Sequence, residues 1–317
     1  MKIAFFSEIG TNEKYFRKFD NARTEVAWCL ALDAPMCSLN KIPLTDHYDL
    51  GIVIIPKNNP NVDLNHIRKV CDKVAVMQEG PHWFFQDYSL DQQFHYYNLL
   101  RNADWVYCHN ESDVNYFTGL GCKDVRVMRS LMLPYGLVSR KDTLLDKYGD
   151  LPSPNAYKES ATIIGGNFVS WYGGFDSYMV ARNVGNPIVA PSMGRKQPLE
   201  DNIEDIEYLP YMTWREWVEN LSEYNIGIHL MRTHAAGTFA MNCAWHGIPC
   251  VGYGGLDTQE ILHPLTTIDV GDLEKAVWIA KKLKDDKFYK LCSETSLKRF
   301  EKNYTEEAWK INWHNTN

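Results

Sequence analysis

One carboxylate in the first half of the sequence stands where a catalytic base could act. Glu79 directly follows the apolar run KVAVMQ, inside the segment VMQEGPHWFF. A carboxylate at the carboxyl end of a buried strand is partly desolvated, which raises its pKa and suits it to general-base catalysis. His82 follows closely and could assist. The alternative interpretation of Glu79 and His82 is an ordinary surface turn.

Three other stretches have the residue types that bind phosphates or nucleobases. The turn IIGGNF contains Gly165 and Gly166, and backbone without side chains can approach a phosphate closely. PSMGRK places Arg195 and Lys196 after a strand-like run, and a guanidinium can bind a diphosphate bidentately. In YLPYMTW, backbone amides could hold a base edge under an aromatic or Met side chain. The alternatives are a tight turn, solvated charges and core packing.

A fourth stretch, HAAGTFAMNCAWHGIPCVGYGG, combines a small-residue turn with a short helix and a strand. The turn runs from His234 to Thr238, and the helix ends at Gly-Ile-Pro. The N–H groups at a helix N-terminus attract anions, so the amides of Gly237, Thr238 and Phe239 are candidate phosphate ligands. Arg232, just before the turn, is a candidate cation for the same ligand.

Composition restricts the class of protein. The chain has 317 residues, of which 45 % are hydrophobic, and a net charge of −7. An acidic chain is a poor non-specific binder of nucleic acid, because phosphate contacts carry most of that affinity. The eight cysteines are scattered without a CxxC pair, which favours reduced, buried thiols. No apolar run is long enough to span a membrane, and MKIAFFSEIG is unlike a signal peptide, so we expect a cytoplasmic protein.

Several familiar motifs are absent from the sequence. It contains no GxGxxG, GxxxxGK[ST], HExxH, GxSxG or DxD, and its histidines have no metal-ligand spacing. We therefore predict no tightly bound cofactor and no protein-held metal. A divalent cation could still accompany a diphosphate ligand.

Short β-branched runs alternate with amphipathic segments along most of the chain. We expect strands over residues 2–7, 49–56, 73–80, 104–110 and 125–134, and helices over 21–33, 61–72, 91–103 and 111–121. Alternation resumes after a polar, proline-containing segment. This pattern predicts an α/β protein with two Rossmann-like, doubly wound parallel domains. Ligands bind beyond the carboxyl ends of such strands, which points to a cleft between the two domains.

The chain resembles glycosyltransferases of the GT-B type. The second half carries the resemblance through its glycine turn, its basic strand end, and a small-residue turn leading into a helix that closes with G-x-P. More narrowly, the chain resembles the bacteriophage T-even DNA β-glucosyltransferase family, which modifies 5-hydroxymethylcytosine. Four places support this: MKIAFF, QEGPHWFF, IIGGNFVS and SMGRK.

The resemblance implies roles for individual residues. Glu79 falls where that family keeps the base that deprotonates the acceptor hydroxyl. The other implied positions are Gly166, Asn167 and Phe168 in the phosphate turn with Gly165 beside them, Arg195 in a basic loop, and Leu209, Tyr211 and Met212 around the uracil. Two positions depart from the family pattern. Val169 replaces a phosphate-binding arginine, and Asn242 replaces a ribose-binding glutamate, so that an amide there would bond a hydroxyl more weakly.

These expectations combine into one predicted function. Residues 1–140 would form an acceptor-binding domain, and residues 141–155 would form a linker. Residues 156–300 would bind a nucleotide sugar, for which we expect a UDP-sugar. Residues 301–317 would form a helix that crosses back to the first domain. Glu79 would drive transfer with inversion; retention stays open if Glu79 is only structural. The expected acceptor is the hydroxymethyl or hydroxyl group of a modified pyrimidine in double-stranded phage DNA, with Lys18 and Arg23 near its backbone. We expect a monomer without membrane contact.

Two rival functions remain open. One is a GT-B glycosyltransferase that acts on a saccharide or a small molecule. The other is a non-catalytic nucleotide-binding module of Rossmann type. The first would glycosylate simple acceptors rather than DNA, and the second would be insensitive to Glu79→Gln.

Overall fold

The computed structural model describes residues 1–14, 24–43, 45–56, 61–78, 80, 82–132, 161–166, 168, 170–191 and 198–317, and only the backbone of residues 82–84 and 170. This part of the chain divides into two compact units. Unit 1 contains residues 1–132 together with His234–Ala236 and Glu306–Asn317. Unit 2 contains residues 161–233 and Gly237–Thr305. The domain boundaries expected from the sequence, and the roles assigned to the domains, stay predictions.

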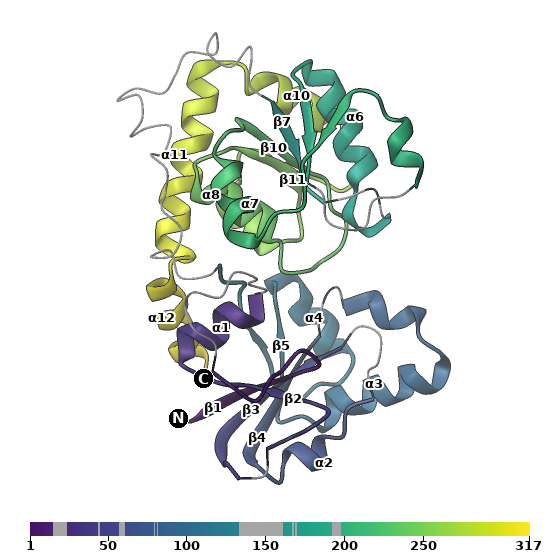
Figure 1. Ribbon diagram of the computed structural model, residues 1–317, viewed down its shortest axis with the longest axis vertical. Helices are drawn as coiled ribbons and strands as arrows, with labels where there is room; N and C mark the ends of the chain where they lie inside the picture. Colours follow the sequence, from purple (N-terminus) through teal and green to yellow (C-terminus); the bar gives the residue numbers. More distant parts are fainter. Residues whose placement is uncertain are drawn as a thin grey trace. The chain divides into compact units, whose positions relative to one another are not determined.

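Unit 1 is built on a six-stranded sheet in the order β2-β1-β3-β4-β5-β6, in which every pair is parallel (Figure 1). Its strands are β1 (Ile3–Ser7), β2 (Met36–Ser38), β3 (Tyr48–Ile55), β4 (Cys71–Gln78), β5 (Trp105–Cys108) and β6 (Val125–Val127). Its helices are α1 (Thr24–Leu32), α2 (Leu64–Ile67), the 3-10 helix η1 (His82–Asp87), α3 (Leu90–Asn102), α4 (Glu111–Gly119) and α12 (Glu306–Thr316).

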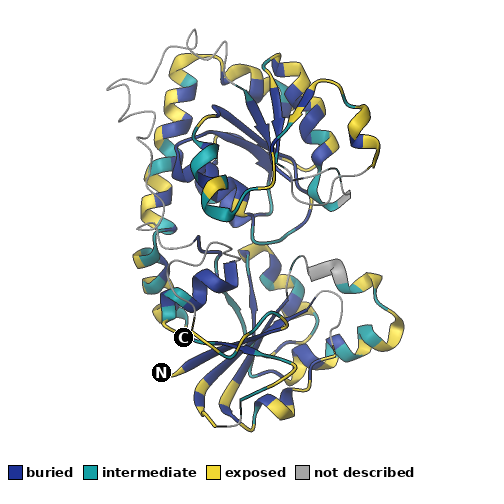
Figure 2. Ribbon diagram, in the orientation of Figure 1, coloured by how far each residue is buried: buried dark blue, intermediate teal, exposed yellow. Residues whose placement is uncertain are grey.

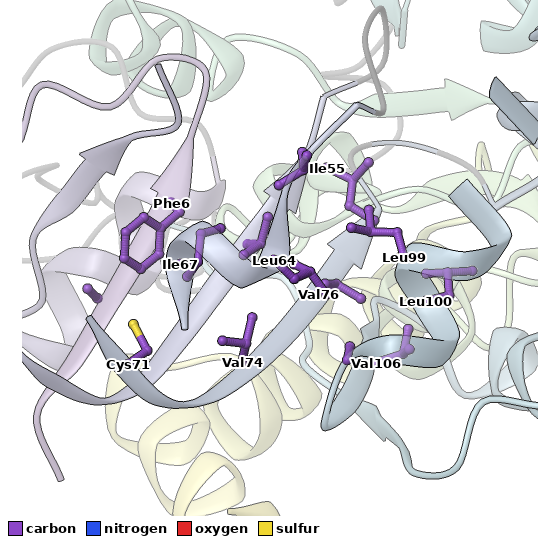
Figure 3. Close-up of a cluster of buried hydrophobic side chains, with 14 of the residues drawn as sticks. Phe6, Ile55, Leu64, Ile67, Cys71, Val74, Val76, Leu99, Leu100 and Val106 are labelled. Atoms are coloured by element: carbon purple, nitrogen blue, oxygen red, sulfur yellow. The ribbon is translucent and has the colours of Figure 1, made fainter. Parts of the chain in front are cut away.

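Helices cover both faces of this sheet because successive strand residues point to opposite sides. On one face, Phe6, Ile55 and Val76 pack in one core with Leu64 of α2 and Leu99 of α3 (Figure 3). On the other face, Phe5 stacks on Trp28 of α1 with ring centroids 6.3 Å apart, and Tyr107 lies 5.6 Å from Trp313 of α12. The inner strands are buried over most of their length, while the edge strand β6 is half-buried and the helices expose their outer sides (Figure 2).

Two elements of unit 1 differ from the sequence prediction. The helix expected over 61–72 is reduced to the four residues of α2, because Cys71 already pairs with Tyr48 of β3 and begins β4. The strand expected over 125–134 ends at Val127, the last residue that pairs with β5. Strand pairing, which sequence periodicity does not reveal, sets both boundaries.

Unit 2 has a second parallel sheet, in the order β12-β11-β10-β7-β8-β9. Its strands are β7 (Thr162–Ile164), β8 (Ile188–Ala190), β9 (Ile206–Tyr208), β10 (Ile226–His229), β11 (Cys250–Tyr253) and β12 (Thr267–Ile268). Its helices are η4 (Ser170–Tyr172), α6 (Gly174–Val184), η5 (Pro198–Asn202), α7 (Trp214–Leu221), α8 (Thr238–Trp245), α9 (Asp257–Leu262), α10 (Leu273–Lys282) and α11 (Asp286–Asn303).

The strand order of unit 2 reverses between β7 and β10, as in a dinucleotide-binding Rossmann sheet. One core joins Ile164 and Ile228 to α6 and α10, and a second joins Ile163 to Phe239 of α8 on the opposite face. The prediction of two doubly wound parallel sheets is confirmed. Because ligands bind at the carboxyl ends of strands where the order reverses, the carboxyl ends of β7 and β10 are the expected ligand site of unit 2.

Two further findings concern the whole described chain. All eight cysteines are free thiols and buried, as expected from their scattered positions. Within the described residues, no helix has both the length and the apolar character needed to cross a membrane.

Candidate nucleotide-sugar site

Two backbone turns meet at the carboxyl ends of β7 and β10. The first is Gly165–Gly166, which follows β7; Gly165 N donates to Ile228 O of β10 at 2.7 Å. The second is the start of α8, where Gly237 is the N-cap residue and Thr238 and Phe239 begin the helix without a side-chain cap. Throughout, we call these residues the glycine edge: Gly165, Gly166, Gly237, Thr238 and Phe239.

Close approach of the backbone explains two of these glycines. A Cβ atom at Gly165 would lie 2.6 Å from His229 Cγ and 2.8 Å from Phe239 Cδ1, so only glycine lets the first turn rest against α8. Gly237 has φ +63°, in the left-handed region, and a Cβ there would lie 2.1 Å from Thr258 Oγ1. The glycine edge is therefore built by packing as well as by turn geometry.

The chemistry of the glycine edge suits an anion. The first N–H groups of an α-helix have no partner within the helix, and the helix dipole adds a partial positive charge at the same end. The Gly165–Gly166 turn lies directly against this helix start, since Phe239 limits the space beside Gly165. Phosphate groups bind at such helix N-termini in Rossmann-like folds. Phe168, also predicted here, is half-buried and packs on Tyr178 of α6 rather than on the glycines.

Arg232 contributes a cation next to the glycine edge in sequence. Its Nη2 lies 2.8 Å from Asp176 Oδ2 of α6, and this contact raises the pKa of Arg232. Tyr253 donates its hydroxyl to the same carboxylate at 3.4 Å. A guanidinium has five N–H donors, so the ion pair with Asp176 leaves donors for a ligand.

The predicted uracil contacts lie after β9. Leu209 is buried, and its N–H donates to Ala190 O at 2.9 Å, so this amide is occupied by the sheet. Tyr211 is 74 % exposed, and Met212 packs against the core that includes Phe239. An exposed ring beside a half-buried Met can cover the face of a base. The uracil assignment stays a prediction.

Asn242 is fully engaged inside unit 2. Its side chain is 3 % exposed. In the carboxamide orientation that satisfies both groups, its oxygen accepts from Trp217 Nε1 at 3.2 Å and its nitrogen donates to Thr238 O at 3.2 Å. Asn242 therefore links α7 to the first turn of α8. The ribose contact that the resemblance implied stays a prediction.

His234 belongs to unit 1 together with Ala235 and Ala236, whereas Gly237 and Thr238 of the same turn belong to unit 2. Its Nδ1 lies 2.7 Å from Asp113 Oδ1, and Asp113 is 4 % exposed. Asn110 donates to Ala235 O at 3.3 Å, and Ser130 donates to Ala236 O at 2.6 Å. These contacts hold the segment His234–Ala236 by its backbone. The predicted role of His234 in phosphate binding is not tested by them.

Several predicted residues lie outside the described part of the chain. These are Lys18, Arg23, Glu79, Asn167, Val169, Arg195 and Lys196; for His82 only the backbone, in η1, is described. Their roles stay predictions. No group of three or more metal-ligating side chains occurs among the described residues.

Two residues at this site were not predicted from the sequence. His229 is the last residue of β10 and lies against Gly165 and Phe239, the latter ring 5.2 Å away. Thr258 Oγ1 is buried and has no hydrogen-bond partner among the described residues, and it lies at Gly237. One signal was present: His229 is a polar residue ending the apolar run NIGIHL, which is unusual for a central strand.

Burial controls the charge of His229. The side chain is 9 % exposed, and desolvation lowers its pKa from 6.5 to about 4. The imidazole is therefore neutral near pH 7. Its Nε2 is buried and has no hydrogen-bond partner among the described residues. A neutral imidazole has one N–H donor and one acceptor nitrogen, so it can bond a ligand without adding charge.

The chain is similar in structure, but not detectably in sequence, to proteins of known function. No protein-family model matches the sequence, and no curated protein matches it. Sucrose-phosphate synthase from Thermosynechococcus elongatus has 12 % identity and a TM-score of 0.73, covering 99 % of this chain and 98 % of that one. Anabaena HepE in complex with UDP and glucose has 10 % identity and a TM-score of 0.65, covering 100 % and 99 %.

A third solved structure is also similar over the whole chain. It is an alpha-glucosyltransferase in complex with UDP and a 13-mer DNA containing a HMU base, with 12 % identity, a TM-score of 0.63 and coverage of 100 % and 99 %. At such low identities, similarity establishes the fold. Two parallel six-stranded sheets with flanking helices match GT-B glycosyltransferase structures over their full length. The chain therefore has the GT-B fold.

Proposed function

We propose that this protein is a glycosyltransferase that moves a sugar from a nucleotide diphosphate sugar, a UDP-sugar, to an acceptor hydroxyl. One observation carries the proposal. The Gly165–Gly166 turn and the uncapped start of α8 meet at the point where the strand order of unit 2 reverses. A diphosphate is the anion that such an edge of a Rossmann-like sheet is suited to hold.

The choice of UDP rests on two supports. Neighbours of the same fold include HepE in complex with UDP-glucose and the alpha-glucosyltransferase in complex with UDP. In this chain, the exposed ring of Tyr211 and the half-buried Met212 follow β9 on the same sheet. They offer a surface for a flat base, while Arg232 and Arg195 offer cations for the diphosphate.

The proposed reaction uses Glu79 as the base. Its carboxylate takes the proton from the acceptor hydroxyl as that oxygen attacks the anomeric carbon. The bond from this carbon to the diphosphate oxygen breaks, and the leaving diphosphate keeps the electron pair. Amides of the glycine edge stabilise the negative charge that develops there. Attack from the side opposite the leaving group inverts the anomeric carbon. Retention of configuration would instead assign Glu79 a structural role.

For the acceptor we propose the hydroxymethyl or hydroxyl group of a modified pyrimidine in DNA. The support is the resemblance to phage DNA glucosyltransferases in the sequence, together with the neighbour in complex with a DNA containing a HMU base. A base inside a duplex must leave the stack to reach such a site. The basic residues Lys18 and Arg23 would hold the phosphate backbone near the flipped nucleotide.

A specific observation favours a second candidate acceptor, a saccharide or another neutral polyol. Unit 1 has a pocket of about 420 Å³ at the carboxyl ends of β1, β2 and β3. Amide and carboxylate side chains line it: Glu8, Asn40, Asn61 and Asp63. The described lining contains neither Lys nor Arg. Such a surface bonds hydroxyl groups and repels phosphates.

A donor-by-acceptor screen tests the proposal. UDP-, GDP- and ADP-sugars are incubated with DNA that carries hydroxymethylated pyrimidines and with simple glycans, and products are identified by mass spectrometry. We expect turnover with a UDP-sugar and hydroxymethylated DNA; turnover with glycans alone selects the second candidate. Absence of turnover for every pair, in a folded protein, rejects the enzyme in favour of a nucleotide-binding module.

Matched variants identify the base. Glu79→Gln should lower kcat by about 100-fold to 10,000-fold and leave UDP affinity unchanged, because a general base acts on the acceptor. Glu13→Gln, at an exposed carboxylate of unit 1, is the control and should leave kcat unchanged. Product stereochemistry, read by NMR, separates inversion from retention. We further propose a cytoplasmic, monomeric enzyme, a location that suits its free thiols.

A further inference from the structure

His229 is a buried polar residue to which the proposed function assigns no role. It ends β10, the strand on one side of the point where the strand order reverses, and β7 lies on the other side. A Cβ atom at Gly165 would lie 2.6 Å from its Cγ, and one at Gly166 would lie 3.3 Å from its Nε2. The imidazole thus rests along the Gly165–Gly166 turn, with Nε2 on the side of Gly166.

Phe239 fixes the other side of the ring. The two rings are edge to face, with centroids 5.2 Å apart and planes at 70°. His229 therefore lies between the glycine turn and the first turn of α8, inside the glycine edge.

One of the two nitrogens of this ring, Nε2, has no hydrogen-bond partner among the described residues. Nε2 is buried, the residue is 9 % exposed, and no described residue bonds Nε2. Buried polar atoms in folded proteins nearly always have a hydrogen-bond partner, so an orphan beside a candidate ligand site calls for an explanation. A ligand atom that arrives at the glycine edge would supply the missing partner.

We propose that His229 binds the nucleotide sugar, with its Nε2–H donating a hydrogen bond to a diphosphate oxygen. The inference rests on the proposed function and adds a ligand to it. A diphosphate oxygen only accepts hydrogen bonds, so the proton must be on Nε2. A neutral hydrogen-bond donor helps to orient the diphosphate without adding another positive charge to the site.

Titration of UDP and of inorganic pyrophosphate by calorimetry tests the inference. His229→Phe keeps the aromatic packing on Phe239 and removes the donor. We expect it to weaken both ligands by about 10-fold to 100-fold, as for loss of a hydrogen bond to a charged group. His229→Gln, whose amide can place an N–H near the same position, should recover part of the affinity. Uridine, which lacks phosphate, should bind the wild type and His229→Phe with equal affinity.

A destabilised control separates folding from binding. His246→Phe lies at the other end of α8 and removes the bond from His246 Nε2 to Val218 O, 2.7 Å long. It should lower the melting temperature and leave UDP affinity unchanged. Equal affinity of wild type and His229→Phe for both ligands overturns the inference. So does an affinity lost for UDP but kept for pyrophosphate, because the contact would then lie outside the diphosphate.

The UDP and pyrophosphate titrations together distinguish a failure of the proposed function from a failure of the His229 inference. If wild type binds pyrophosphate but not UDP, the uridine part of the proposed function fails, and the pyrophosphate arm still decides the role of His229. If wild type binds neither, both are rejected. Should the variants fail to fold, ¹⁵N-histidine NMR of the wild type replaces them: saturating pyrophosphate should shift one buried Nε2 signal, and an unchanged spectrum overturns the inference.

Discussion

Two buried histidines of unit 2 differ in their partners. His263 closes α9, and both of its nitrogens are used: Nδ1 accepts from Cys250 N at 3.3 Å and Nε2 donates to Ala240 O at 2.9 Å. His229 has the same lowered pKa of about 4, also because of desolvation, but its Nε2 has no partner among the described residues. Burial alone therefore does not distinguish them; hydrogen bonding does.

This difference separates a structural residue from a residue that can bind a ligand. His263 joins α8, β11 and α9 through two backbone groups, so its bonds are part of the fold. His229 packs against Gly165 and Phe239, and its Nε2 has no hydrogen-bond partner among the described residues. Substitutions at the two positions should then affect different properties.

The largest effect is expected on stability. His263→Phe leaves Cys250 N and Ala240 O buried without partners and should lower the free energy of unfolding by about 4 kcal/mol, at roughly 2 kcal/mol for each group. His229→Phe removes an atom that has no such bond and should change it by less than about 1 kcal/mol. Urea denaturation measures both. Equal losses would contradict the comparison.

Acid should weaken the fold through both residues. Their pKa values of about 4 lie below 6.5, so the unfolded chain binds protons more readily, and stability falls as the pH drops from 6.5 towards 4. Each shift corresponds to about 3 kcal/mol at the acid end. His229→Phe should therefore flatten the loss between pH 7 and pH 4.5 by about 2 to 3 kcal/mol. An unchanged slope in urea denaturation would show that His229 is not held neutral by burial.

The close contact between Gly165 and His229 can be tested by substituting Gly165. Gly165→Ala would force a Cβ to 2.6 Å from His229 Cγ, which should cost about 2 kcal/mol and abolish measurable UDP binding. Gly185→Ala is the matched control, because its φ is +79° but nothing lies within 4 Å of the new Cβ. It should cost about 1 kcal/mol from backbone strain and leave UDP affinity unchanged. If both variants bind UDP normally, the glycine edge is not the diphosphate site.

The smallest effect is expected at Asn242. Trp217→Phe removes the indole N–H that Asn242 accepts at 3.2 Å and should lower the free energy of unfolding by about 1 kcal/mol. UDP affinity should change by less than about 3-fold if Asn242 serves only to join α7 to α8. A loss of 10-fold or more, measured by calorimetry, would restore the ribose contact implied by the resemblance.

The general fold was predictable because alternation of apolar strands and amphipathic helices is a local pattern. It predicted two doubly wound parallel sheets, and the structure confirms them with the GT-B fold. Element ends were less predictable. The helix expected over 61–72 shrank to α2 because Cys71 is drawn into the sheet by pairing with Tyr48.

The glycine turn at Gly165–Gly166 and the helix start at Gly237 could be predicted from the sequence, because both depend on neighbouring residues. The contact between these two turns could not, since 72 positions separate Gly165 from Gly237 and their contact depends on β7 pairing with β10. The tertiary structure also gives Asn242 two internal partners, while His229 Nε2 has none in the part of the chain that the structure describes. Hydrogen-bond partners come from across the fold, and a residue's type and its neighbours in sequence do not specify them.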